Sequence, residues 1–145
     1  MDRPSSEFPP LHNRVLVVDD DRAARETAAA LLEDSYVVVT AEDGPSALKV
    51  LERREIDVIC TDYEMPGMTG RELLNLVHSR FPCVAGVLMT GHREYLSTPP
   101  SYGRGYVFDI VLKPFDPANL MRTIDRALDR ARVARELQRR AARAR

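Results

Sequence analysis

Polar and charged side chains stand at the ends of four short apolar runs in this sequence. They are Asp19, Asp20 and Asp21 after the first run, Asp62 near the end of the third, Thr90 after the fourth and Lys113 after the fifth. Clustered carboxylates repel one another, and a hard divalent cation such as Mg²⁺ relieves that repulsion while keeping waters and phosphate oxygens as further ligands. Because phosphoryl transfer requires an acceptor oxygen, a metal, a cation and a hydroxyl, the set predicts a magnesium-dependent phosphoacceptor site.

Asp62 is the residue that we expect to accept the phosphoryl group. It should project from the middle strand of a sheet, and a carboxylate can form an aspartyl phosphate. Asp19 and Asp20 should converge on it from the neighbouring strand end. Lys113 follows an apolar run and precedes Pro114, so it should lie at a buried strand end, where a cation needs an anionic partner.

A plainer interpretation exists for each of these residues taken alone. Three consecutive acids favour the amino end of a helix, and Asp21 is the residue that we expect to cap it. Thr90 could simply end a strand, and Lys113 could be a solvated charge. The convergence of all these groups on one edge of the sheet favours a common site.

The elements that would position these side chains are five strands that alternate with helices. The apolar runs that predict the strands are Val15–Val18, Tyr36–Thr40, Val58–Cys60, Val84–Met89 and Val107–Leu112. Continuous apolar runs suit strands buried on both faces, and intervening segments of helical period are typical of βαβ units. The predicted fold is a single α/β domain of the flavodoxin-like kind, a (βα)5 doubly wound parallel five-stranded sheet that binds ligands at the carboxyl ends of its strands.

Helix starts are predicted at two proline-containing pairs, Gly44-Pro45 and Asp116-Pro117, because proline suits the first helical turn. The segment His92–Gly105 is less favourable, since it contains Pro99-Pro100 and two glycines. We expect at most a short fourth helix there, followed by a loop.

Length and composition suit one core, with 145 residues of which 44% are hydrophobic. We expect a disordered N-terminal tail over residues 1–13, the domain over 14–130, and an Arg/Ala-rich helical extension or tail over 131–145. Cys60 and Cys83 are expected to be buried thiols, because their number and spacing suit neither disulfides nor zinc. No signal peptide and no apolar run near the roughly 20 residues of a membrane span is evident, so we expect a cytoplasmic location.

Charge is divided unevenly along the chain. Residues 1–121 carry 12 basic and 19 acidic side chains, a net charge of −7, whereas residues 122–145 carry nine arginines and three acids, a net charge of +6. A basic segment can bind nucleic acid. Because no helix-turn-helix or other DNA-binding motif is recognisable, we interpret the arginines as a solvated helix face and expect no nucleic-acid partner.

Four motifs resemble the receiver domains of bacterial two-component response regulators over roughly Arg14 to Asp129. In order, they are the segments 15–20 (VLVVDD), 61–70 (TDYEMPGMTG), 89–91 (MTG) and 113–115 (KPF). The resemblance implies that Asp62 takes a phosphoryl group from a sensor histidine kinase, a phosphotransfer protein or a small phosphodonor. It implies no enzymatic activity beyond self-phosphorylation and autodephosphorylation.

The resemblance also implies how Mg²⁺ and the phosphoryl group are held. Asp20 and Asp62 would bind the metal directly, together with the backbone carbonyl of Glu64, and Asp19 would help through water. Lys113 would pair with the phosphoryl group, and its bond to Pro114 is commonly cis in the family.

In such domains, further residues report the phosphorylated state to the fold and set the lifetime of the phosphoryl group. Thr90 would turn its hydroxyl onto a phosphoryl oxygen and so report phosphorylation to the fold. Glu64 and His92 stand at positions that border the path of hydrolytic water, so they would set how long the phosphoryl group survives, although both could be ordinary exposed polar residues. Ile110 replaces the tyrosine or phenylalanine that often swings inward with the threonine, which implies that the usual aromatic switch is absent or relocated.

Two other functions stay open. The chain could be a receiver-like binding module that acts without phosphate cycling, as Ile110 and the interrupted fourth helix suggest. It could also be an aspartate-dependent phosphatase, for which Asp19 and Asp21 provide the D-x-D spacing. The sequence does not identify the kinase or the downstream protein partner, and a homodimer stays open.

Overall fold

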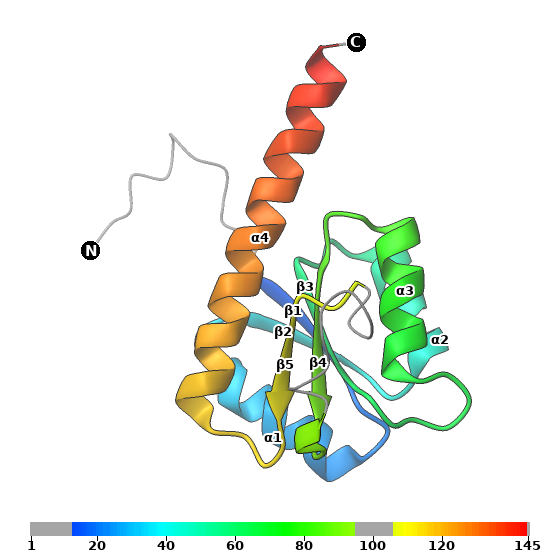
Figure 1. Cartoon of the computed structure of the whole chain (residues 1–145), viewed down its shortest axis with the longest axis vertical. Coiled ribbons are helices and arrows are strands. Elements are labelled where there is room, and N and C mark those ends of the chain that lie inside the picture. The colour runs from blue at the N-terminus through cyan, green and yellow to red at the C-terminus, as the bar shows by residue number, and fades with distance from the viewer. Residues whose placement is uncertain (1–12, 95–105, 145) are drawn as a thin grey trace.

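The computed structural model describes residues 13–94 and 106–144, which form three layers around one parallel sheet (Figure 1). The strands are β1 (Arg14–Val18), β2 (Val37–Ala41), β3 (Val58–Asp62), β4 (Ala85–Thr90) and β5 (Asp109–Leu112). Their spatial order is β2-β1-β3-β4-β5, and every neighbouring pair is parallel. The predicted doubly wound sheet is confirmed, and its strand order reverses between β1 and β3.

The helices cover both faces of the sheet. They are α1 (Arg22–Leu32), α2 (Gly44–Arg53), α3 (Gly70–Arg80) and α4 (Pro117–Arg143). Helices α1 and α4 pack on one face and α2 and α3 on the other, and each face has its own buried apolar layer. Successive side chains of a strand point to opposite faces of the sheet, so β1 contributes to both layers. Val15 and Val17 belong to the first layer, whereas Leu16 and Val18 belong to the second.

Short polar side chains begin each helix. Asp21, Asp43, Thr69 and Asp116 are the N-caps of α1, α2, α3 and α4 in that order. Asp21 Oδ1 accepts a hydrogen bond of 3.0 Å from the backbone N–H of Ala23, so the predicted cap of α1 is confirmed. The helix starts predicted from Gly44-Pro45 and Asp116-Pro117 are confirmed as well.

Two predictions fall mainly on residues outside the described ranges. The predicted N-terminal tail, residues 1–13, includes Asn13 as its only described residue. Of the predicted short fourth helix and loop, residues 92–105, only 92–94 are described. Neither prediction is tested.

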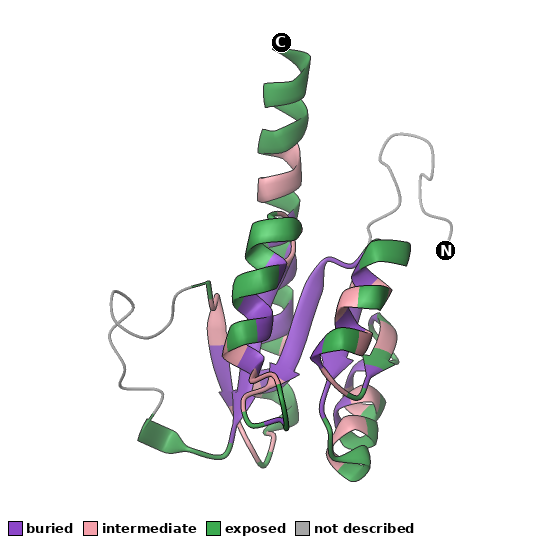
Figure 2. Ribbon diagram, turned by 90° about the vertical axis from the view of Figure 1, so that its right-hand side faces the viewer, coloured by how far each residue is buried: buried purple, intermediate pink, exposed green. Residues whose placement is uncertain are grey.

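Helix α4 continues across residue 130 without interruption and runs for 27 residues. It passes back along the sheet from the carboxyl ends of the strands and stands clear of the body at its far end (Figure 1). Burial falls along its length, as Figure 2 shows, from Ala131 at 1% exposed to Val133 at 57% and Leu137 at 60%. The described part of the predicted extension is therefore helical up to Arg143, while the domain boundary at residue 130 stays a prediction. None of the described helices is both long and apolar enough to cross a membrane.

A buried ion pair fastens α4 to the amino edge of the sheet. Asp57, 4% exposed and directly before β3, forms an ion pair of 3.0 Å with Arg135 through one oxygen and accepts a hydrogen bond of 3.0 Å from the backbone N–H of Arg14 through the other. Arg135 also donates to the backbone carbonyl of Ile56 at 3.1 Å. These contacts, which we call the Arg135–Asp57 latch, hold α4 beyond its last buried apolar residue.

The two cysteines differ in burial. Cys60 is fully buried, as predicted, and burial raises the pKa of its thiol to about 12. The prediction that Cys83 is buried is wrong: it lies in the turn before β4, is only partly covered, and its Sγ donates to Gln138 Oε1 at 3.2 Å.

Removal of the latch tests its contribution to stability. Arg135→Met should lower the free energy of unfolding by about 2 kcal/mol, because the Asp57 carboxylate would stay buried without its cationic partner. Urea unfolding followed by circular dichroism measures the change. The matched control is Arg132→Met on the same helix, where the pair with Asp129 is exposed and its loss costs well under about 1 kcal/mol. Equal losses in the two variants would contradict the latch.

Candidate functional site

The carboxyl ends of four strands bring the predicted site residues to one edge of the sheet. The register places Val18 of β1 opposite Thr61 of β3, so Asp19 and Asp62 occupy adjacent strand ends. Thr90 is the last residue of β4 and pairs with Leu112 of β5, after which Lys113 follows. The predicted convergence is therefore confirmed, and it results directly from the reversal of strand order between β1 and β3.

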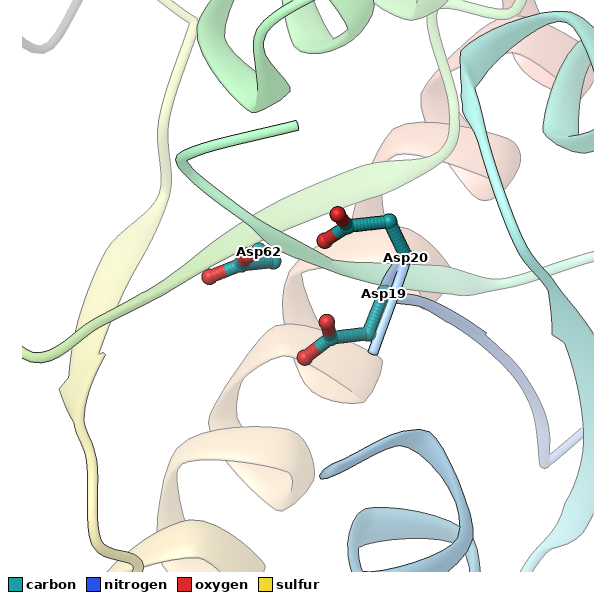
Figure 3. Close-up of side chains that lie close together, drawn as sticks. All are labelled: Asp19, Asp20 and Asp62. Carbon is teal, nitrogen blue, oxygen red and sulfur yellow. The ribbon is translucent and has the colours of Figure 1, made fainter. Parts of the chain in front are cut away.

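Three carboxylates form a compact cluster at this edge (Figure 3). One oxygen of each of Asp19, Asp20 and Asp62 lies within 4.8 Å of those of the other two. Asp19 is buried, Asp62 is half-buried and Asp20 is exposed, so the cluster opens to solvent on one side. Three negative charges this close need compensation by cations.

Lys113 provides part of that compensation. Its Nζ donates to Asp19 Oδ2 at 2.7 Å and to Asp62 Oδ1 at 3.1 Å. Burial alone would lower the pKa of Lys113, but its hydrogen bonds and charge interactions with Asp19 and Asp62 outweigh that effect, so the pKa is raised and the lysine stays charged. One lysine balances one of three negative charges.

The uncompensated negative charge contributes to the pKa of Asp62. Burial raises the pKa of its carboxyl above the ordinary value, Lys113 lowers it in part, and the charges of Asp19 and Asp20 raise it further. Ionisation of the Asp62 carboxyl is therefore less favourable in the metal-free protein than in water.

The donor set fits Mg²⁺. All three groups offer hard oxygen ligands, and the metal takes one or two carboxylates while keeping waters. Carboxylate oxygens within 4.8 Å of one another are close enough that Asp19, Asp20 and Asp62 would hold one such ion, directly or through its waters. Asp20 and Asp62 would be the natural direct ligands, because both oxygens of Asp19 already accept hydrogen bonds, Oδ2 from Lys113 and Oδ1 from the backbone N–H of Asp21 at 3.0 Å, whereas Asp62 accepts from Lys113 through Oδ1 alone.

Two residues near the cluster contact each other. His92 Nε2 lies 2.7 Å from Glu64 Oε1, and its Nδ1 lies 3.3 Å from Glu94 Oε1. Thr90, 1% exposed, accepts through its hydroxyl from the backbone N–H of His92 at 3.1 Å. The positions predicted to control phosphoryl lifetime are therefore joined to the threonine in one short chain of contacts.

Gly70 is a positioning residue that the sequence reasoning did not single out. A Cβ at this position would lie 2.1 Å from the backbone carbonyl oxygen of Asp62, and the Gly70 N–H donates to Tyr63 O at 2.9 Å. Only glycine lets α3 begin this close to the end of β3. The available signal was a glycine directly before a helical segment and eight residues after Asp62.

The family model of the response regulator receiver domain matches residues 15–125. The chain belongs to this family. NtrC of Escherichia coli K12, a DNA-binding transcriptional regulator, is 34% identical over 115 residues, which are 79% of this chain but 24% of NtrC. The response regulator protein FleR of Pseudomonas aeruginosa is 33% identical over 114 residues, 78% of this chain and 24% of FleR. This chain thus spans about a quarter of the length of these curated relatives.

Solved structures agree with the assignment to the receiver family. The signal receiver domain of an HD domain-containing protein from Pseudomonas fluorescens Pf-5 is 25% identical with a TM-score of 0.81, covering 91% of this chain and 98% of that one. The chemotaxis response regulator CheY4 of Vibrio cholerae is 32% identical with a TM-score of 0.68, covering 79% and 97%.

Two further features of this receiver domain bear on the predictions. The Lys113-Pro114 peptide bond is cis, as the resemblance implied. Ile110, in place of the usual aromatic residue, is 8% exposed and packs in the same buried layer as α2 and α3. An aliphatic side chain thus fills this position within the core.

Stability in the absence of metal tests the charge balance at Asp62. A carboxyl group with a raised folded-state pKa favours folding while it is protonated, and this contribution is lost as the pH rises through that pKa. Asp62→Asn should therefore raise the melting temperature in EDTA at pH 7, and the gain should shrink as the pH falls toward the unfolded value of about 3.9.

Asp34→Asn, at an exposed turn, is the matched control and should leave the melting temperature unchanged. A lower melting temperature for Asp62→Asn at pH 7 in EDTA would show that Asp62 stabilises the metal-free fold.

Proposed function

We propose that this receiver domain accepts a phosphoryl group on Asp62 in the presence of Mg²⁺ and signals through a protein partner. The observation that carries the proposal is the half-buried Asp62 carboxylate beside Asp20 and in contact with the charged Lys113. A purely structural ion pair would not need two further acids at the same strand ends.

The chemistry follows from the placement of the charged groups. One oxygen of Asp62 attacks phosphorus as the bond to the donor's nitrogen or oxygen breaks, and the product is an aspartyl phosphate. Lys113 lies within hydrogen-bond distance of the acceptor, where it would stabilise the charge on the transferred group. Bound Mg²⁺ would supply further charge neutralisation for the equatorial oxygens.

We assign the remaining positions as follows. Asp20, Asp62 and the backbone carbonyl of Glu64 would hold Mg²⁺, with Asp19 acting through water. Thr90 would exchange its present contact with the His92 N–H for one to the phosphoryl group and so report the modification.

The phosphodonor would be a histidine of a sensor kinase or of a phosphotransfer protein, in keeping with membership of the family. The domain would act in the cytoplasm, where such donors phosphorylate receivers, and the only catalysis would be self-phosphorylation and autodephosphorylation. The downstream partner would be a protein, with no nucleic acid or membrane bound by the domain and a homodimer still open.

The binding module without phosphate cycling is the second candidate, and the burial of Ile110 at the usual switch position favours it. A phosphatase is less supported, because Asp21 caps α1 and does not join the carboxylate cluster. Both alternatives are separated from the proposal by the following measurements.

Phosphorylation of the intact protein is the direct test. Incubation with acetyl phosphate and Mg²⁺ should add one phosphoryl group, detected by intact-protein mass spectrometry, and EDTA should prevent it. Asp62→Asn should remain unmodified, whereas Asp34→Asn should behave as the wild type. Absence of modification in the wild type favours the binding module, and turnover of phosphate esters favours the phosphatase.

Lys113 should act on the rate of phosphoryl transfer to Asp62. Lys113→Met should slow phosphorylation by about a hundredfold or more, the usual effect of removing a group that stabilises transition-state charge. The rate is measured from the appearance of the phosphorylated mass with time. Lys49→Met, at an exposed position of α2, is the control. A change below about threefold would remove Lys113 from the proposed mechanism.

The contact between Glu64 and His92 should control the lifetime of the aspartyl phosphate. Because the two side chains meet at 2.7 Å beside the site, their separation should open the path for hydrolytic water and shorten the lifetime severalfold. Glu64→Ala and His92→Ala should give similar lifetimes, and the double variant should add little, since all three lack the same contact. Additive effects would show that the two residues act separately.

A further inference from the structure

A second cavity lies at the edge of the sheet opposite to Asp62. Its volume is about 580 Å³, and three segments line it: the end of α2 with the following loop, the connection between α3 and β4, and the last turns of α4. Ile56 and Val84, which precede β3 and β4, form part of its wall. Because β3 spans roughly 17 Å, at about 3.3 Å for each of its five residues, this cavity is separate from the phosphoacceptor site.

The α4 wall belongs to this chain and lies outside the receiver family match. Arg135, Gln138 and Arg139 line the cavity, whereas the family model ends at residue 125. The Arg135–Asp57 latch sets the position of this wall relative to the sheet. A receiver domain without the extension would have an open surface at this place.

Apolar and cationic groups face the cavity together. Leu51, Ile56, Phe81 and Val84 provide apolar surface. Arg135 is already neutralised by Asp57, but Arg54 makes no ion pair with any carboxylate among residues 13–94 and 106–144. Arg139 lies 3.9 Å from Glu136, a carboxylate that Arg140 and Arg143 also share at 3.2 Å and 3.5 Å.

The lining therefore has an excess of positive charge. With Arg135 neutralised by Asp57, Arg54 and Arg139 remain against Glu55, the one acidic side chain among the described lining residues, which lies 3.9 Å from Arg135. Guanidinium groups favour planar oxyanions such as carboxylates, sulfonates and phosphates. A volume of this size lies within the usual range of about 300 to 1,000 Å³ for small-molecule sites, in which apolar walls hold the body of the ligand and a few polar groups fix its orientation.

We propose that this cavity is a second binding site that takes a small organic anion with an apolar body, held by Arg54 and Arg139 against the apolar wall. Such a ligand would bridge the body of the domain and α4. It would therefore strengthen the attachment of the helix that the latch already holds. The site does not depend on phosphorylation of Asp62.

Anilinonaphthalene sulfonate, an aromatic anion, is a suitable probe for the intact 145-residue chain. Fluorescence titration should give saturable binding, and the neutral analogue phenylnaphthylamine, which lacks the sulfonate, should bind at least about tenfold more weakly. Arg54→Gln/Arg139→Gln should remove the preference for the sulfonate over the neutral analogue. Arg22→Gln/Arg132→Gln removes the same charge from exposed positions of α1 and α4 and should retain it.

A variant that fills the cavity tests whether the probe binds inside it, and not merely to the arginine charges. Gln138→Trp places a large side chain in the cavity from the exposed part of α4 and should weaken binding with both arginines present. Circular dichroism verifies that each variant is folded. Amide chemical shifts should move on titration at residues 54–56 and at Phe81, Cys83 and Val84.

Asp62→Asn should bind the probe like the wild type, which keeps this test independent of phosphorylation. The proposal would be overturned if Arg54→Gln/Arg139→Gln bound anilinonaphthalene sulfonate as tightly as the wild type. It would also be overturned if the control pair Arg22→Gln/Arg132→Gln weakened binding equally, or if the amide shifts were confined to the surroundings of Asp62.

Discussion

Repulsion among three carboxylates at one edge of the sheet is the constraint on which the rest of this structure depends. Carboxylate oxygens of Asp19, Asp20 and Asp62 lie within 4.8 Å of one another, and Lys113 donates hydrogen bonds to two of these residues. Local charges of this kind disfavour the fold unless a cation enters. Groups that oppose folding while serving binding or chemistry are expected at functional sites.

The strand order creates this charge cluster, and the core tolerates it. Because β1 and β3 are neighbours, the ends of strands far apart in sequence meet, and Lys113 reaches them from the edge strand β5. Strands β1, β3 and β4 are almost wholly buried, so the acids that follow β1 and end β3 are held in place by a rigid apolar framework. Gly70 adds to the constraint by letting α3 begin against the carbonyl of Asp62.

Sequence reasoning predicted the parts of the structure that local patterns determine. Apolar runs located all five strands, and the capping role of Asp21 followed from its place before a helical segment. The converging edge followed from the strand order, which chain chirality and short connections restrict to few arrangements.

Contacts between distant side chains could not be predicted in the same way. The Arg135–Asp57 latch joins residues 78 positions apart and requires α4 to remain helical beyond its last buried apolar residue. An arginine-rich segment gives no indication of which arginine is buried. The burial of Cys83 was wrongly predicted for a related reason, because its apolar neighbours belong to a turn and not to the strand.

Helix α4 runs from the carboxyl ends of the strands to their amino ends. It begins four residues after Lys113, under the cap of Asp116, and Arg135 attaches its later part to the amino ends of the strands, eight residues before the helix ends. A new charge on Asp62 would redistribute the contacts of Lys113 between two acids, and the short connection to α4 would experience that change directly. With Ile110 buried in place of an aromatic switch, a helix capped close to Lys113 and attached through Arg135 would give this receiver a mechanical route from Asp62, the proposed acceptor, to the amino ends of the strands. That route needs no aromatic side chain to move.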